Sequence, residues 1–312
     1  MTRRLRFIVA ALGLAFAPHP AGAQAEQVIK VGAGAFEANA GAYYAQDNGF
    51  FKQVGLNVEI QAYNGGGAIA AAVIGGSLQI GVANPLPIAA AHEKGLDFVI
   101  IAPGSLYDLA TTPPNLMVTP NSPIHNGKDL EGSTVAVTSL QGLDPLGVME
   151  WIDKTGGDSH KVKLVELPQT LMGDAVASGR VAAAMMADPA VTAALNAGKV
   201  RGLSKSYAYI GNHFFVSCWF SSREWADRNP DLVRRFRIAI DMAGTWATKN
   251  PEAAAAILKK YMNISVARAR EVHAKTSEPS MVQPVIDAAV RYKYLDRPMD
   301  AREIIWMGPN HS

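Results

Sequence analysis

Short apolar runs alternate with longer helix-forming segments through the first hundred residues. Apolar or alternating runs predict strands at Val28–Val31, Asn57–Gln61, Leu78–Val82 and Phe98–Ala102. Helix-forming segments lie between them, at Ala40–Asn48, Phe50–Val54, Gly65–Ile74 and Pro85–Lys94. Strands that alternate with helices in this way predict parallel βαβ units.

The same alternation restarts after the loop at 111–115. Strands are predicted at Leu116–Val118, Thr134–Val137, Val162–Glu166, Ala182–Met186 and His213–Phe220, and helices at Pro145–Thr155, Thr170–Ser178 and Pro189–Ala197. Beyond Ser222 the pattern is helical, with segments at Glu224–Asn229, Pro230–Thr248, Pro251–Tyr261, Ser265–Lys275 and Met281–Tyr292. The pattern therefore predicts two α/β lobes and a helical C-terminal third.

The first 25 residues have the pattern of a signal peptide. Three arginines precede the apolar run Phe7–Ala17, which is shorter than the roughly 20 residues that a membrane span needs. Small residues then allow cleavage after Ala23 or Ala25. The single cysteine, Cys218, lies far from this point, so we expect no lipoprotein anchor. The pattern predicts an exported, periplasmic protein.

Composition narrows the class of protein further. The 312 residues are 49% hydrophobic and 18% charged, which fits about two globular domains with a sizeable core. The net charge is +2, and removing the three signal arginines leaves 26 basic residues against 27 acidic ones. A net charge of −1 argues against a nucleic-acid partner. The folded part is therefore expected to recognise a partner through a local site.

The sequence lacks the motifs of the common cofactor and metal sites. One cysteine excludes a disulfide framework, and the seven histidines are scattered. Gly32-Ala33-Gly34 follows the first strand, but Glu37 stands where a dinucleotide fingerprint needs its third glycine. No nucleophile motif is present. We expect no metal, no cofactor and no catalytic residues.

Five predicted helices begin with Asn or Asp followed by Pro, at Asn84, Asp144, Asp188, Asn229 and Asn250. Such pairs are good helix starts, because the side chain caps free N–H groups and Pro fits the first helical position. The first three also follow predicted parallel strands, where open sheets bind ligands. Each of these three residues is therefore either a structural helix cap or a ligand contact, and the sequence leaves both roles open. The same holds for Gly65-Gly66-Gly67, which is either a tight turn or a close approach to a ligand.

A family resemblance rests on motifs in a fixed order. Tyr43-Tyr44-Ala45-Gln46-Asp47-Asn48-Gly49-Phe50-Phe51, followed by Gly55-Leu56-Asn57-Val58, resembles the opening of periplasmic substrate-binding proteins of the nitrate/sulfonate/taurine type, in the superfamily that includes thiamin-precursor-binding proteins. Further matches are Gly75–Gly81, Asn84–Phe98, Lys128–Ala136, Asp174–Arg180 with Asp188-Pro189, and Ser221–Pro230. The likeness covers essentially all of the chain after the signal.

The resemblance implies a two-lobed periplasmic binding protein of type II, the Venus flytrap, with two crossings between its lobes. The signal peptide would be residues 1–25. Lobe one would be residues 27–111 plus 220–312, and lobe two residues 113–219.

Carried over by position, the resemblance also implies a ligand site in the cleft between the lobes. Its residues would be Ala35, Phe36, Asn39, Gly66, Gly67, Ala83, Asn84, Ser139, Leu140, Gln141, Gly142, Asp188 and Phe214. Relatives that bind sulfonates often have an aromatic residue before Asp-Pro, whereas this chain has Ala187. We expect no Arg or Lys in the cleft loops, which leaves room for an anionic, aromatic or heterocyclic ligand.

The function that the resemblance implies is capture of a small organic molecule and its delivery to the permease of an ABC transporter in the inner membrane. We expect a monomer that is not an enzyme. One alternative is an enzyme of the same fold, resembling pyrimidine-synthesising or menaquinone-pathway relatives. Another is a sensory protein that presents its ligand to a receptor.

Overall fold

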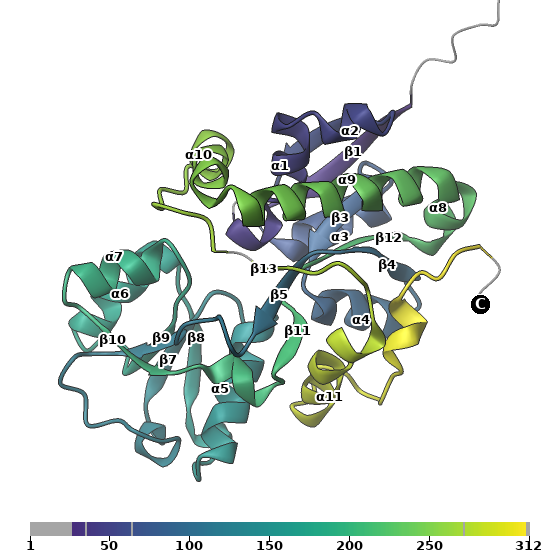
Figure 1. The fold of residues 1–312 in the computed structure, drawn as a ribbon. Coiled ribbons are helices and arrows are strands. Elements are labelled where there is room, and N and C mark those ends of the chain that lie inside the picture. Colours follow the sequence, from purple (N-terminus) through teal and green to yellow (C-terminus); the bar gives the residue numbers. More distant parts are fainter. Residues whose placement is uncertain (1–26, 35, 64, 271, 310–312) are drawn as a thin grey trace, which may run out of the picture.

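The computed structural model describes residues 27–309 apart from residues 35, 64 and 271 (Figure 1). The predicted signal peptide and Ala35 lie outside the described residues. Among the described helices, none combines the length and the apolar character that crossing a membrane requires.

The first sheet has five strands in the order β2-β1-β3-β12-β4. They are β1 Val28–Ala33, β2 Asn57–Ala62, β3 Ile80–Ala83, β4 Phe98–Pro103 and β12 Cys218–Ser222. Strand β1 pairs in parallel with β2 and β3, as the βαβ pattern predicts. Strand β12 comes from more than a hundred residues later and runs antiparallel between β3 and β4. The chain therefore returns to its first sheet after building the second.

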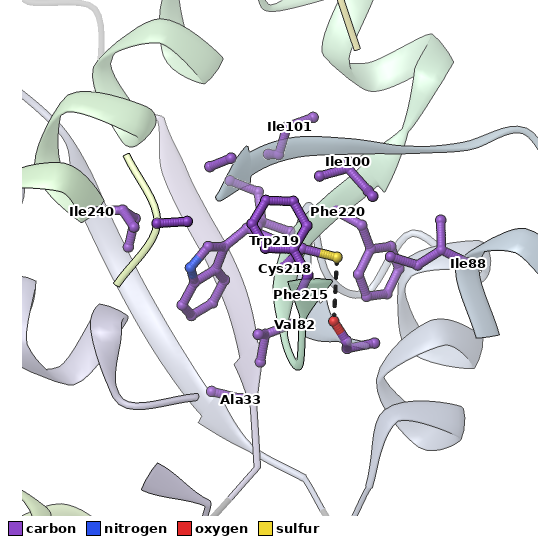
Figure 2. Packing of buried hydrophobic residues seen from close by; sticks show 14 of the residues in the cluster. Ala33, Val82, Ile88, Ile100, Ile101, Phe215, Cys218, Trp219, Phe220 and Ile240 are labelled. Carbon is purple, nitrogen blue, oxygen red and sulfur yellow. Dashed lines mark hydrogen bonds between the residues drawn. The ribbon is translucent and has the colours of Figure 1, made fainter. Parts of the chain in front are cut away.

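Helices cover this sheet on both faces (Figure 1). They are α1 Gly41–Asp47, α2 Phe50–Gln53, α3 Gly66–Ile74, α4 Pro85–Glu93, α8 Arg223–Arg228, α9 Pro230–Lys249, α10 Pro251–Met262 and α11 Gln283–Arg291. Phe236 of α9 stacks on Phe51 at 5.7 Å and meets Trp219 at 5.5 Å between ring centroids. Figure 2 shows Trp219 and Phe220 in this core, with the Cys218 thiol directed at the Ala83 carbonyl oxygen, 3.4 Å away. Burial of these rings supplies the main stabilisation of this region.

The second sheet also has five strands, in the order β10-β6-β9-β7-β8. They are β6 Leu116–Val118, β7 Thr134–Val137, β8 Lys163–Glu166, β9 Ala183–Met185 and β10 Arg201–Ser204. Its helices are α5 Leu143–Lys154, α6 Gln169–Ala177 and α7 Ala190–Asn196. One core packs Trp151 of α5 against the sheet, and a second packs Met172 of α6 with Val191 of α7. This region therefore has a core on each face of its sheet.

A small third sheet lies where the chain passes between the two larger ones. Its antiparallel strands are β11 His213–Phe215, β5 Ser105–Asp108 and β13 Val272–His273, in that order. Short 3-10 helices complete the fold: η1 Glu37–Asn39, η2 Lys128–Leu130, η3 Ser159–Lys161, η4 Ser206–Tyr209, η5 Pro279–Met281 and η6 Ala301–Ile304. Strands β5 and β11 lie in the two connections between the larger sheets (Figure 1).

Two expectations about the later part of the chain are wrong. The predicted helix at 265–275 is an extended segment among its described residues: Ala269 N–H donates to Pro251 O at 2.9 Å, and Ala274 N–H to Gly104 O at 2.9 Å. Long-range hydrogen bonds to a strand here override local helix propensity. The predicted strand at 213–220 is two strands, because Val216 and Ser217 both turn their N–H groups to Ser105 O.

Of the five predicted caps, two accept a hydrogen bond from a backbone N–H in the first turn of their helix, Asn84 and Asp188. Asn84 accepts a hydrogen bond from Leu86 N–H at 3.1 Å at the start of α4. Helix α5 begins two residues early, so Asp144 lies inside it. Asn229 and Asn250 donate to carbonyl oxygens four residues back and so satisfy the end of the preceding helix. An Asn between two helices can serve either end.

Candidate ligand-binding site

The loops that follow β1 and β2 lie against one another. Phe36 precedes η1 and is 48% exposed, and Asn39 ends η1 half-buried. A Cβ at Gly34 would lie 3.3 Å from the Asn39 amide nitrogen and 3.3 Å from Tyr63 O. The loop therefore needs glycine at this position to bring the two strand ends together.

The glycine turn after β2 has separate roles at its three positions. Gly65 has φ +99°, a backbone conformation that side chains rarely adopt. A Cβ at Gly66 would touch the Ala83 Cβ at 3.4 Å, so α3 packs closely on the end of β3. A Cβ at Gly67 would meet nothing within 4 Å. Gly65 and Gly66 are explained by the turn, and Gly67 is open to a ligand.

Asn84 lies at the end of β3 and is half-buried. Its side-chain oxygen is engaged by the cap of α4. The amide nitrogen is thereby oriented by the same contact, and this NH₂ group is the part that a ligand can use.

The second sheet contributes the loop between β7 and α5. Ser139 Oγ accepts from Gln141 N–H at 3.1 Å, and Leu140 N–H donates to a Glu166 carboxylate oxygen at 2.6 Å. Gln141 is exposed, and Gly142 is the N-cap residue of α5. These local bonds fix the loop while the Gln141 side chain stays in solvent.

Asp144 supports this loop from beneath. It is 9% exposed and accepts hydrogen bonds from Thr138 N–H at 2.9 Å and from the Tyr207 hydroxyl at 2.5 Å. Burial, with Asp144 beside it, raises the pKa of Tyr207 well above its ordinary value. The phenol therefore remains a neutral donor. Asp144 is a positioning residue rather than the exposed helix start that the sequence predicts.

Asp188 lies just before α7, at the end of β9. One carboxylate oxygen accepts from Thr192 N–H at 3.2 Å and from the Thr192 hydroxyl. The other accepts from the Arg270 guanidinium at 3.3 Å. The Asp188 side chain is 13% exposed, whereas that of Arg270 is 59% exposed. Thr192 of α7 therefore fixes one carboxylate oxygen of Asp188, and the other oxygen contacts Arg270.

Arg270 joins the two halves of the candidate site. Its backbone N–H donates to a Glu37 carboxylate oxygen at 2.6 Å, and its side chain reaches Asp188. Glu37 belongs to η1, beside Phe36, and Asp188 belongs to the second-sheet region. Arg270 is not among the residues that the resemblance implies for the site, yet its guanidinium contacts Asp188. The sequence held no local signal for it, because Arg270 and Asp188 are 82 residues apart.

Phe214 lies in β11, in the second connection between the larger sheets, but its ring is not exposed there. It is fully buried, with its ring 5.2 Å from Tyr107 and 6.0 Å from Tyr207 between centroids. In this conformation it offers no surface to a ligand. Its ring instead packs the crossing strands β5 and β11 against η4.

Two of the cavities on the described surface help to place the candidate residues. The one of about 120 Å³ lies beside Arg270, between Tyr44, Thr248 and His273. The one of about 350 Å³ lies at the amino ends of β7 and β9, near Thr134 and Ala182. The larger cavity is therefore at the end of the sheet opposite the candidate residues. In the described part of the chain, no three His, Cys, Asp or Glu side chains gather as metal ligands would.

Comparison with known proteins shows the family of this chain. The family model described as NMT1/THI5 like matches residues 37–254. The chain belongs to this family. The resemblance inferred from the sequence is thereby confirmed.

Individual relatives show what this chain is similar to. The taurine-binding periplasmic protein of Escherichia coli (strain K12) is 26% identical over 224 residues. That match covers 70% of this chain and 65% of the relative, so this chain spans less than two thirds of the relative's length.

Solved structures share the fold. The periplasmic aliphatic sulphonate binding protein SsuA from Escherichia coli superposes with a TM-score of 0.74 at 19% identity, over 90% of this chain and 92% of that one. The desulfurization enzyme DSZB superposes with a TM-score of 0.66 at 14% identity, over 91% and 96%. The predicted α/β periplasmic binding fold is confirmed, and one neighbour with this fold is named an enzyme.

Proposed function

We propose that this protein is a periplasmic solute-binding protein that captures a small organic molecule between two lobes and delivers it to an ABC transporter permease. Lobe one is residues 27–111 with 220–312, and lobe two is residues 113–219. The observation that carries the proposal is Arg270, whose backbone is bound to Glu37 of lobe one and whose guanidinium contacts Asp188 of lobe two. A ligand at this point touches both lobes.

The chemistry of the walls favours a small organic anion with an apolar part. Arg270 offers guanidinium donors beyond the one that contacts Asp188, which suits a carboxylate or sulfonate. Asn39, Asn84 and Gln141 supply neutral hydrogen bonds. Exposed Phe36 and Leu140 lie in the loops of opposite lobes and can cover the apolar part.

Binding is proposed to occur by closure about the third sheet. A ligand that contacts both lobes stabilises the closed arrangement by its higher affinity for that state. The aromatic cluster of Tyr107, Tyr207 and Phe214 gives the hinge a packed core, so the lobes rotate as units.

An enzyme of the same fold is the second candidate, favoured by the likeness to DSZB. Cys218 is an unsuitable nucleophile, because it is fully buried and burial raises the pKa of its thiol far above the ordinary value. The candidate loops hold no His. Chromatography of each bound solute after incubation separates the two functions, since an enzyme converts the solute and a carrier returns it intact.

Thermal denaturation with a panel of solutes tests the proposal. The panel contains taurine, aliphatic sulfonates, nitrate, aromatic carboxylates and pyrimidines. A true ligand at 100 times its Kd stabilises the native state by about 2.7 kcal/mol, which raises Tm by several degrees. Absence of a shift with every member of the panel would contradict the proposal. We further propose export with signal cleavage and a monomeric carrier, which N-terminal sequencing and light scattering test.

A further inference from the structure

A buried carboxylate lies where α5 of lobe two meets α11 of lobe one. Glu150 of α5 is 1% exposed. It pairs with Lys154 of its own helix at 2.9 Å and with Arg291 at the end of α11. A buried carboxylate requires such partners, because burying an unpaired charge is costly. One of the two partners comes from the other lobe.

A second polar contact lies beside the first. The hydroxyl of Tyr292 donates to an Asp153 carboxylate oxygen at 2.8 Å. Burial and this hydrogen bond raise the pKa of Tyr292 above its ordinary value, so it stays a neutral donor. Two consecutive residues at the end of α11 therefore bind two residues of the last turns of α5.

This contact and the candidate site lie on different sides of the hinge. In Figure 1, α5 and α11 meet below strands β5 and β11, whereas α7, α10 and the segment that leads into β13 lie to the left. The candidate residues are at the start of α5, and Glu150 and Asp153 are near its end. A rotation about the third sheet that brings α7 toward α10 carries the end of α5 away from α11.

We propose that the α5–α11 contact, made by Arg291 with Glu150 and by Tyr292 with Asp153, holds the cleft open until a ligand closes it. Closure separates these pairs, and the free energy of that separation is subtracted from the binding free energy. Ligand affinity is thus set partly by residues far from the ligand. This inference rests on the proposed closure of two lobes, but it does not depend on the identity of the ligand.

The chain supplies a matched set of variants. Arg291→Ala removes the ion pair between the lobes, while Lys154 still compensates Glu150 within α5. Tyr292→Phe removes only the second hydrogen bond. Lys154→Ala removes a partner of the same carboxylate without touching the contact between lobes, so it serves as the control. Thermal denaturation shows that each variant is folded.

The fraction of ligand-free protein in the closed arrangement is measured by crosslinking across the proposed cleft. Cysteines replace Asn196 of α7 and Ala256 of α10, which are both exposed, while native Cys218 is fully buried and does not react. A short bismaleimide joins the two thiols at a rate that follows the closed population, even when that population is small. The labelling rate of each thiol with a monofunctional maleimide is measured separately, and it corrects the crosslinking rate for differences in thiol reactivity between variants.

We expect Arg291→Ala to raise the crosslinking rate about five-fold or more, as typical couplings do. Tyr292→Phe should raise it less, and Lys154→Ala should match the parent. Equal rates in Arg291→Ala and the parent would overturn the proposal, and so would equal acceleration by Lys154→Ala. Because no solute is added, these outcomes are independent of the thermal screen, so failure of the solute panel and failure of this contact are distinguishable.

Discussion

Arg270 contacts Glu37 of η1 through its backbone and Asp188, just before α7, through its side chain. Its guanidinium is more than half exposed, so its ion pair with Asp188 adds little to the stability of the fold. A guanidinium held this loosely by protein groups can exchange Asp188 for a ligand anion. Its main role is therefore expected in binding.

Arg270→Gln is the direct test at this residue. Hydrogen bonds to charged groups contribute about 1.5–3 kcal/mol, so we expect affinity for an anionic solute to fall roughly 10- to 100-fold. The Tm without ligand should change little. Titration calorimetry measures the affinity, and Arg268→Gln, two residues earlier on the same exposed segment, is the control. Equal losses in both variants would show a general charge effect instead of a contact.

His273 provides a pH test at the residue scale. It lies in β13 against α9, where burial lowers its pKa from 6.5 to about 4. The unfolded chain therefore binds a proton more readily, and the stability that the neutral ring contributes is present above pH 6.5 and is lost as the pH falls toward 4. The loss from this group is about 3 kcal/mol.

Urea unfolding between pH 7 and pH 4 measures this loss. The stability of the wild-type protein should fall more steeply over this range than that of His273→Gln, which has no titrating ring. Parallel curves would show that His273 titrates alike in the folded and unfolded states.

The strand pattern predicts which candidate residues follow strands, but it does not predict the contacts between them. Loops after parallel strands are local features, so the positions of Asn84 and Asp188 follow from the strand pattern, whereas Gln141 is implied only by the family resemblance. Arg270 reaches Asp188 only through the fold, and Phe214 has a strand position whose exposure depends on Tyr107 and Tyr207. Neither the Arg270–Asp188 contact nor the burial of Phe214 can be predicted from the local sequence.

Elements with a strong local pattern were predicted within a few residues. Strands β6 and β7 have the predicted bounds, and α9 differs by one residue at its end. The strands β5, β10 and β13 were missed, because each has a weak apolar pattern and depends on a distant partner. The segment at 265–275 has good helix formers, but its described N–H groups bind β4–β5 and α10 neighbours instead.

Ser217, between β11 and β12, provides a test at the scale of the elements. Ser217 is 2% exposed; its hydroxyl accepts from Ser105 N–H at 3.1 Å and donates to Ala38 O at 2.5 Å. It therefore ties the η1 loop of the candidate site to the third sheet. We expect Ser217→Ala to lower the free energy of unfolding by about 1–3 kcal/mol, because two buried groups lose their partner.

Urea denaturation measures this change in the free energy of unfolding. Ligand affinity should also fall in Ser217→Ala, because η1 loses the hydrogen bond from Ser217 to Ala38 O. Ser178→Ala removes an exposed hydroxyl that bonds only within its own helix end, and it should change stability by less than about 0.5 kcal/mol. A stability change in Ser217→Ala no larger than in this control would contradict the role of the hydroxyl.

At the scale of the molecule, the C-terminal segment contacts lobe two on both sides of the hinge. Arg270 contacts Asp188 at the candidate site, and Arg291 contacts Glu150 at the far side. The helical third predicted from the sequence is thus more than a cover for the first sheet. It links the proposed ligand site, the third sheet and the contact that is proposed to oppose closure.

The protein is proposed to carry an unmodified small molecule between its lobes. Native mass spectrometry of protein isolated from the periplasm, followed by identification of the released molecule, tests this carrier function. We expect one small organic anion per chain, released intact and absent from Arg270→Gln but present in Arg268→Gln. Protein that carries no molecule after isolation with the solutes of the thermal panel, or that releases a converted product, would contradict the carrier function.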